Sequence, residues 1–180
     1  KAQSVNGGWP WFPGMPESRY ITQHIITGMG HLDHLGIKDV KENHKVWQMV
    51  KKGVDYLDGE IVKDYRNAKR YDPAYLTNQH LGYDQVQYLY ARSYFPQLEM
   101  NGDTKEAVSY FKDQAVKFWL NFNIYAEGMI ALAAHRFEMV ELSTDIVKSL
   151  KDRSIHHDEF GMYWKDYQAG YYWYEAPIET

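Results

Sequence analysis

The sequence contains no cysteine among its 180 residues. This absence excludes disulfide bonds, thiolate nucleophiles and cysteine-containing zinc sites. It does not indicate a cellular compartment, because many exported proteins also avoid thiols. The common catalytic loops are missing as well: Gly28-Met-Gly30 lies within a helical pattern and lacks the rest of a phosphate-binding motif, and there is no Gly-x-Ser-x-Gly sequence.

Long apolar runs and excess positive charge are also absent. No stretch approaches the ~20 apolar residues of a membrane span, and residues 1–20 lack the apolar core of a signal peptide. The net charge is −4 and the isoelectric point is about 6.1, whereas nucleic-acid binding calls for a basic face. We therefore expect no nucleic-acid partner and no direct insertion of this chain into a membrane.

Aromatic residues are abundant, with sixteen Tyr and six Trp in a chain that is 44% hydrophobic. Such side chains combine a large apolar area with a polar group, which suits half-buried surfaces, grooves and interfaces. The length corresponds to one domain. Because the sequence begins in a loop pattern and ends at Pro-Ile-Glu-Thr, a helix-start signal, we expect residues 1–180 to be a fragment excised from a much larger chain.

Apolar residues at helical spacing predict an all-α fold with six helices and the start of a seventh. Asp72 and Pro73 are read as the N-cap and first residue of the third helix. One small β-hairpin is predicted within residues 162–174. The predicted helices cover residues 20–35, 41–65, 73–95, 103–120, 124–137 and 139–156.

Two stretches of the chain repeat one order of residue types. Asn6–Tyr20 reads NGGWPWFPGMPESRY and Glu159–Thr180 reads EFGMYWKDYQAGYYWYEAPIET. Each places glycine and aromatic residues before an acidic, proline-containing helix start. Glycine permits positive φ and close backbone approach, so we interpret both stretches as joints between helix hairpins. The residues expected to matter structurally are Gly7, Gly8, Trp9, Gly161, Trp164 and Tyr172.

The first joint resembles a loop found in α/α-toroid proteins. Residues Gln3–Trp9 have the pattern Gln-x-x-Asn-Gly-Gly-Trp, which is similar to the Gln-x-x-(Asp/Asn)-Gly-(Gly/Ser)-(Trp/Phe) loop between their helix pairs. Together with RYITQHIITGMGHL, EGMIALAAHRF and GMYWKDYQAGYYWYEAPIET, this loop makes the chain resemble the bacterial α2-macroglobulin family, in its Bacteroides-type branch. The resemblance runs from Gln3 to Thr180.

The resemblance implies part of the thioester-type α/α toroid of a large envelope-anchored protein that traps or inhibits proteases. It implies a periplasmic or cell-envelope location, and as partners the target proteases and other domains of the same long chain. In thioester-bearing members a Cys-Gly-x-Gln motif bonds covalently to the target, and this chain has no cysteine. We expect no enzymatic activity, and no catalytic, cofactor-binding or metal-binding residues.

Several histidines suggest chemistry that we interpret as structural. His31 and His34, with His24 earlier in the same helix, have spacings that could place imidazoles on one helix face, as in some metal sites. A third ligand is not evident, and the His-Glu-x-x-His pattern of metal-dependent hydrolases is missing. His156 and His157 lie at a predicted helix end, where a histidine favours the helix dipole. His80 falls where a histidine assists acyl transfer in thioester-bearing relatives, and without a thioester a structural role is favoured.

The main alternative is a carbohydrate-active enzyme of toroid fold, either a glycoside hydrolase or a polysaccharide lyase. Such sites combine aromatic platforms with a pair of acids. The structural interpretation is favoured because the two stretches repeat one pattern, whereas a catalytic site usually breaks symmetry. A third possibility is a scaffold whose aromatic groove holds a neighbouring domain. The candidate acids are Glu17, Asp166, Glu175 and Glu179, and the candidate platforms are Trp9, Trp11, Trp164, Tyr172 and Trp173.

Overall fold

In the computed structural model, which describes residues 3–37 and 39–165, helices dominate and two short antiparallel ribbons complete the fold. The expectation of a mainly helical chain is confirmed. The helices are α1 (Arg19–His34), α2 (Asp39–Glu42), α3 (His44–Tyr71), α4 (Tyr83–Arg92), α5 (Gly102–Phe118), α6 (Ile124–Arg136) and α7 (Val140–Asp152), with a 3₁₀ turn, η1 (Trp119–Asn121), after α5.

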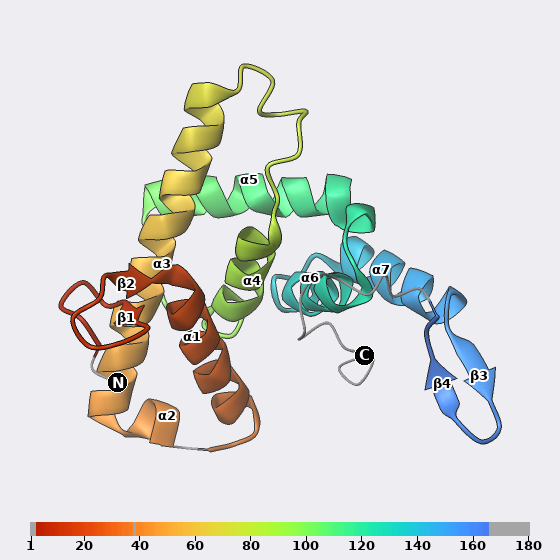
Figure 1. The fold of residues 1–180 in the computed structure, drawn as a ribbon, viewed down its shortest axis with the longest axis horizontal. Helices are drawn as coiled ribbons and strands as arrows, with labels where there is room; N and C mark the ends of the chain where they lie inside the picture. Colours follow the sequence, from red (N-terminus) through yellow and green to blue (C-terminus); the bar gives the residue numbers. More distant parts are fainter. Residues whose placement is uncertain (1–2, 38, 166–180) are drawn as a thin grey trace.

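The two ribbons flank the helices in the sequence. β1 (Trp9–Pro10) pairs with β2 (Glu17–Ser18), and β3 (Ile155–His157) pairs with β4 (Gly161–Tyr163). Figure 1 shows the first ribbon beside the start of α1 and the second extending from the end of α7. Gly161 has a φ of +70° where the chain enters β4, a conformation that glycine adopts without steric cost.

Side-chain caps decide where four of the helices begin. Ser18, Asn43, Asn101 and Asn123 each accept a hydrogen bond from a backbone N–H in the first turn of the helix that follows. These N–H groups have no partner inside the helix, so the cap replaces water as their acceptor. The cap at Asn43 explains why α3 begins at His44 and not at the predicted residue 41.

The long helices form two sets, and helices that follow one another in the sequence belong alternately to one set and the other. Helices α1, α4 and α6 contact one another in series, while α3 contacts α5. Successive helices also pack across the two sets, as α1 does on α3 and α6 on α7. Figure 1 shows α4 between α1 and α6, with α3 upright at the left and α5 running across above α4 and α6.

A buried ion pair joins the two sets at the centre of the core. Arg92 of α4 contacts Asp58 of α3, with Nε 3.1 Å from Oδ1, and Tyr88 donates its hydroxyl to the same carboxylate at 2.6 Å. Arg92 is 2% exposed and also donates to the carbonyls of Phe95 and Leu98. The guanidinium therefore fixes the segment that leads from α4 toward α5 as well as the packing of α4 on α3.

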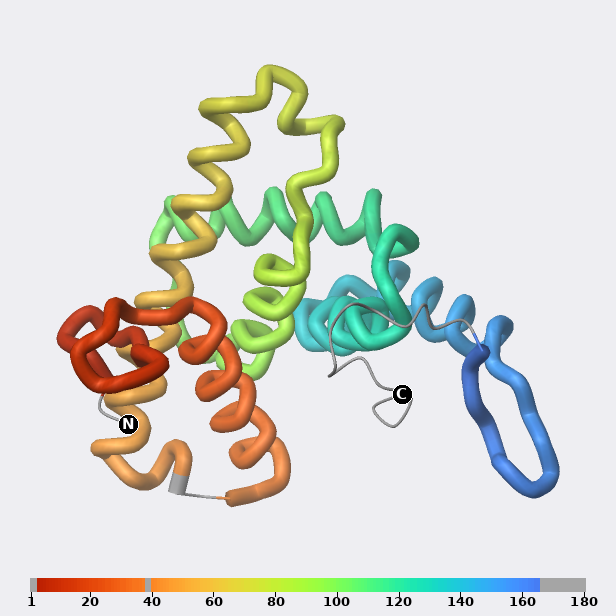
Figure 2. The backbone as a smooth tube through the Cα atoms, in the orientation of Figure 1, coloured from red at the N-terminus to blue at the C-terminus, as the bar shows by residue number. Residues whose placement is uncertain are grey.

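The prediction of a helix over residues 73–95 is wrong in its first half, because α4 begins only at Tyr83. Asp72 is not an N-cap: it ends α3, and its side chain accepts a hydrogen bond from the N–H of Ala74. Such local side-chain bonds favour turns over helix. Figure 2 shows the resulting connection from α3 to α4 as the yellow-green turn at the top.

The predicted end of the sixth helix and the predicted hairpin are also corrected. The helix α7 ends at Asp152, before residue 156, because residues 155–157 form β3. β4 overlaps the segment that was predicted to be the first strand of a hairpin within residues 162–174. It pairs with β3, which precedes it in the sequence, and not with a later strand of that hairpin. The second predicted strand and the start of a seventh helix fall on residues 166–180, outside the described residues.

Candidate functional site

The N-terminal loop is fixed to α3 by its glutamine and its first glycine. Gln3 donates its side-chain amide to the carbonyls of Gly7 and Met49, each at 2.8 Å. Gly7 has a φ of +97°, and a Cβ at this position would lie 2.0 Å from the carbonyl oxygen of Lys52. Both the backbone conformation and the lack of space therefore require glycine at residue 7.

Trp9 fills the space between α1 and α3. Trp9 is 3% exposed, and its backbone N–H donates to the hydroxyl of Thr22 on α1 at 2.9 Å. On the α3 side the indole lies against Gly53. The hypothesis that Trp9 serves as a sugar platform is therefore wrong, because no face of the ring is open to a ligand.

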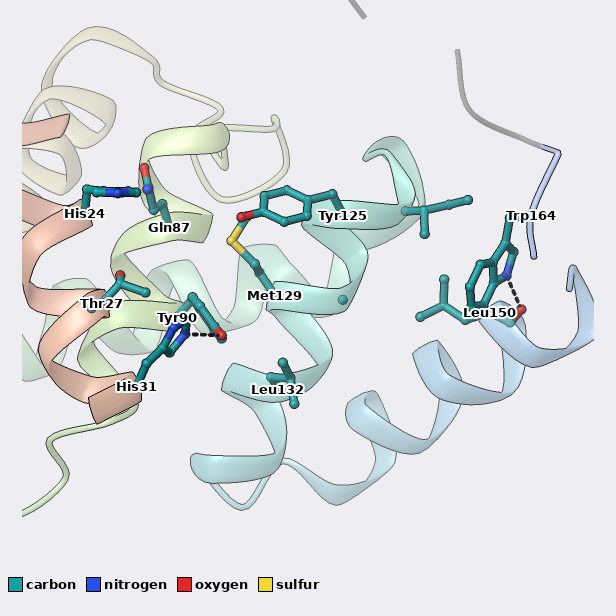
Figure 3. Close-up of a pocket in the computed structure, with 13 residues that line it drawn as sticks. His24, Thr27, His31, Gln87, Tyr90, Tyr125, Met129, Leu132, Leu150 and Trp164 are labelled. Carbon is teal, nitrogen blue, oxygen red and sulfur yellow. Dashed lines mark hydrogen bonds between the residues drawn. The ribbon is translucent and has the colours of Figure 1, made fainter. Parts of the chain in front are cut away.

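A cavity of about 550 Å³ lies between α1, α4 and α6 and is bounded by residues from α7 and from the end of the chain that is described. Figure 3 shows side chains from these elements around it. Two of the lining residues, Gly28 and Gly128, are helical glycines at which an added Cβ would meet no atom within 4 Å. Their missing side chains help to leave the cavity open.

The rings that line this cavity come from three separate parts of the chain. Tyr90 belongs to α4, Tyr125 to α6, and Trp164 follows β4. The indole Nε1 of Trp164 donates to the carbonyl of Leu150 on α7 at 2.7 Å, which fixes the ring at the cavity edge (Figure 3). Trp164 was singled out from the sequence, whereas Tyr90 and Tyr125 were not, because only the packing of α4 and α6 brings them together.

A hydrogen-bonded cluster occupies one side of the cavity. The Nε2 of His31 is 2.9 Å from the hydroxyl of Tyr90, which is 2.9 Å from the hydroxyl of Tyr94. The guanidinium carbon of Arg136 lies 3.7 Å from the centroid of the Tyr94 ring, a cation–π contact. Burial raises the pKa of Tyr94 to about 12, so this hydroxyl stays protonated at neutral pH.

The electrostatics of this cluster disfavour a second positive charge. Although His31 is partly exposed, partial burial of its ring lowers its pKa below the usual 6.5, and Arg136, His34 and His24 lower it further. His31 is therefore mainly neutral at neutral pH, and it remains able to accept the hydroxyl hydrogen of Tyr90. The positive charge of Arg136 also opposes a metal cation here, and the Nε2 of His31 is already hydrogen-bonded to Tyr90, which does not favour the metal hypothesis for His24, His31 and His34.

Three polar side chains in the lining have no hydrogen bond to other described residues. They are His24 and Thr27 of α1 and Gln87 of α4, and the ring of His24 stacks on Tyr20. Outside the cavity, Tyr20 stacks in turn on Trp11, with ring centroids 5.7 Å apart and planes 10° from parallel. A row of three nearly parallel rings thus leads from the β1–β2 loop to the cavity.

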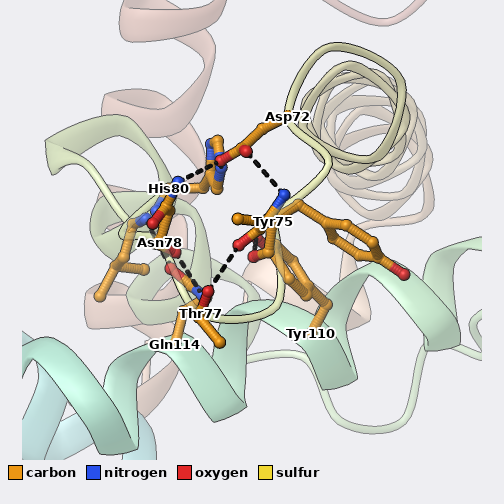
Figure 4. A network of polar contacts seen from close by, with 9 residues as sticks. Asp72, Tyr75, Thr77, Asn78, His80, Tyr110 and Gln114 are labelled. Atoms are coloured by element: carbon orange, nitrogen blue, oxygen red, sulfur yellow. Dashed lines mark hydrogen bonds and ion pairs between the residues drawn. The ribbon is translucent and has the colours of Figure 1, made fainter.

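His80 lies in a different part of the molecule, beside a second cavity of about 410 Å³. Its Nε2 is 2.9 Å from Oδ2 of Asp72, which also accepts from the side-chain amide of Asn78 at 2.8 Å. The amide oxygen of Gln114 on α5 accepts from the backbone N–H of His80 (Figure 4). The hydrogen bond from His80, followed by that from Asn78, lowers the pKa of Asp72. These contacts give His80 a structural role in the α3–α4 connection.

Carboxylates are distributed unevenly between the two cavities. The described residues that line the larger one include no Asp or Glu. The smaller one is lined by Asp64 and Asp72, but Asp64 accepts from Arg19 at 2.5 Å and from Gln85 at 2.7 Å. Both acids are therefore already engaged by neighbouring side chains.

The remaining candidates from the sequence lie in the β-ribbons or outside the described residues. Glu17 is in β2, where a hydrogen bond from its own backbone N–H, then bonds from Ser4 and Asn6, lower its pKa. His156 and His157 are in β3 and not at a helix end. The other acids and platforms, Asp166, Glu175, Glu179, Tyr172 and Trp173, lie outside the described residues.

The described residues contain neither a metal-binding cluster nor a membrane-spanning helix. Within residues 3–37 and 39–165 no three or more His, Asp or Glu side chains are grouped so that they could hold a metal ion. None of the helices in the same ranges is long and apolar enough to cross a bilayer.

Comparisons of the chain with protein-family models, with curated proteins and with solved structures gave no match.

Proposed function

We propose that this chain is a non-catalytic binding domain of α/α-toroid type, belonging to an α2-macroglobulin-like protein that traps or inhibits proteases at the cell envelope. The proposal rests mainly on how the Gln3–Trp9 loop packs against α1 and α3. Gln3 and Gly7 attach the loop to α3, and Trp9 wedges between α1 and α3. This is the role that the resemblance assigns to the loop, as a joint between helices.

The order of helix contacts supports the toroid part of the proposal. A ring of helix hairpins needs successive helices to alternate between an inner and an outer layer. The serial contacts of α1, α4 and α6 and the contact of α3 with α5 follow this alternation. Under the proposal, α1, α4 and α6 belong to the inner layer, and other parts of the same long chain complete the ring.

The chemistry of the site favours binding over catalysis. The larger cavity presents aromatic rings, imidazole and amide groups, without a carboxylate among its described lining residues. The chain also contains no cysteine. Any contribution of this domain to holding a protease is therefore non-covalent, through surface complementarity with the target or with neighbouring domains of its own chain.

The test of this proposal uses the protein at its natural length. Incubated with a set of secreted proteases, it should lower the cleavage of a large protein substrate and co-elute with the protease in size-exclusion chromatography. A matched variant with Trp9→Ala should lose much of this effect, because the joint between α1 and α3 is broken. If neither inhibition nor co-elution occurs with any protease, the proposal is contradicted.

The carbohydrate-active enzyme remains the alternative. Hydrolysis needs two carboxyl groups separated by about 5–5.5 Å or about 6.5–9.5 Å across an open cleft. Asp64 and Asp72 are the two acids that line one cavity, and both are bound by neighbouring side chains. We rank this alternative second for that reason.

A further inference from the structure

We propose that the cavity between α1, α4 and α6 binds a neutral oligosaccharide without cleaving it. This inference goes beyond the proposed trapping of proteases and does not depend on it. It rests on three observations: the aromatic rings in the lining, the polar groups there that have no hydrogen bond, and the absence of charged side chains among the described lining residues.

Aromatic rings provide the apolar surface on which a sugar ring stacks through its C–H groups. Tyr90, Tyr125 and Trp164 line the cavity. The bond from Trp164 to the carbonyl of Leu150 holds the indole in place before any ligand arrives. A side chain that is already ordered loses little conformational entropy on binding, so the arrangement favours affinity.

The polar groups in the lining match the hydroxyl groups of a sugar. Gln87 offers both a donor and an acceptor, and the ring of His24 carries two nitrogens that can form hydrogen bonds with hydroxyl groups. Neither side chain has a hydrogen bond within the described part of the chain. Sugar hydroxyls donate and accept at once, so they can satisfy both groups, which an apolar ligand cannot.

The lack of charged side chains in the described lining favours a neutral ligand over an acidic one. The described lining residues include no Asp, Glu, Lys or Arg. A uronic acid or a phosphate would lose hydration there without gaining an opposite charge, which is costly. Arg136, the nearest cation to His31 in the cluster, is engaged with the Tyr94 ring and the Ser93 hydroxyl.

The size of the cavity is also suitable for a short oligosaccharide. Its volume of about 550 Å³ is within the range of roughly 300–1,000 Å³ that is usual for small-molecule sites.

The experiment uses calorimetry to measure how the chain binds uncharged hexasaccharides of glucose, mannose, xylose and N-acetylglucosamine. Hexagalacturonate serves as the acidic ligand for comparison. Gly28→Leu and Gly128→Leu place side chains into open space in the cavity. Gly59→Leu is the matched control, since it adds the same side chain to an exposed helical glycine on α3 that also has no atom within 4 Å. Thermal unfolding of each variant verifies that it is folded.

The expected result is binding of at least one neutral hexasaccharide, weakened more than about tenfold by each cavity variant, a loss of about 1.4 kcal/mol, and unchanged by Gly59→Leu. Gln87→Ala should weaken it by about fivefold through the loss of a hydrogen bond. The inference is overturned if no neutral sugar binds, if only hexagalacturonate binds, or if folded Gly28→Leu and Gly128→Leu proteins bind as tightly as the parent.

Discussion

The indole of Trp9 lies directly against the backbone of Gly53. A Cβ on Gly53 would come within 2.8 Å of Cζ3 of Trp9 and within 2.6 Å of Cδ1 of Ile26. Gly53 lies inside α3 and does not have a positive φ. Glycine is therefore required here by the close approach of a large ring, and this contact joins the N-terminal loop, α1 and α3.

Replacing Gly53 tests this contact. Gly53→Ala should lower the free energy of unfolding by about 1–3 kcal/mol, the usual cost of overpacking a core. Gly59→Ala, six residues along the same helix with open space around its Cα, should instead raise it by about 0.5–1 kcal/mol. Urea unfolding measures both. Equal stability of the two variants would show that Trp9 does not pack against α3.

The buried pair of Asp58 and Arg92 should be a major determinant of stability. Asp58→Ala leaves the guanidinium of Arg92 buried without its counter-charge, which costs about 3–5 kcal/mol. Lys63→Ala removes a surface pair with Glu60 and should change stability by less than about 1 kcal/mol. Chemical denaturation of both proteins checks the contrast. A small effect of Asp58→Ala would mean that water reaches the pair.

The lowered pKa of His31 predicts how stability depends on pH. Between its lowered value in the folded state and the usual 6.5, the unfolded chain binds more protons than the folded one. Linkage then makes stability rise with pH across this window and fall on acidification below 6.5. His31→Gln should flatten this part of the profile, measured as thermal midpoints from pH 5 to 8. An unchanged slope would show that His31 is not the source of the effect.

The enzyme alternative makes an opposite prediction to the proposed function. We expect no new reducing ends when the chain is incubated with neutral polysaccharides, because the acids in the smaller cavity are engaged. An assay for reducing sugar checks this outcome. Should reducing ends appear and disappear again with Asp64→Asn, the non-catalytic account is contradicted, while the sugar site in the larger cavity is not.

Helix positions could be predicted well where local signals agree. The predicted helix over 20–35 corresponds to α1, and that over 124–137 corresponds to α6, within one residue at each end. In both cases apolar residues at helical spacing follow a capping side chain, Ser18 or Asn123. The packing of these helices on one another depends on long-range contacts and was not accessible from these signals.

The α3–α4 connection shows why other parts could not be predicted. Asp72 and Pro73 have the composition of a helix start, but the Asp72 carboxylate bonds to Asn78 and His80. The connection is further held by Gln114 from α5, more than thirty residues away. No local sequence pattern predicts that contact, because it forms only when α5 packs on α3.

The cavity likewise depends on contacts between distant segments. Trp164 could be singled out from the repeated Gly–aromatic pattern, and His24 and His31 could be singled out from their helical spacing. Gly28 and Gly128, which leave the space open, lay within predicted helices and were not singled out as cavity residues. Their meaning is visible only once α1, α4 and α6 lie side by side.

The most direct test of the central claim is whether the protein at its natural length holds a protease. Size-exclusion chromatography after incubation with secreted proteases should show the protease co-eluting with the protein, with reduced cleavage of a large protein substrate, and Trp9→Ala should weaken both. Elution of every protease at its own volume, with undiminished cleavage of that substrate, would contradict the account.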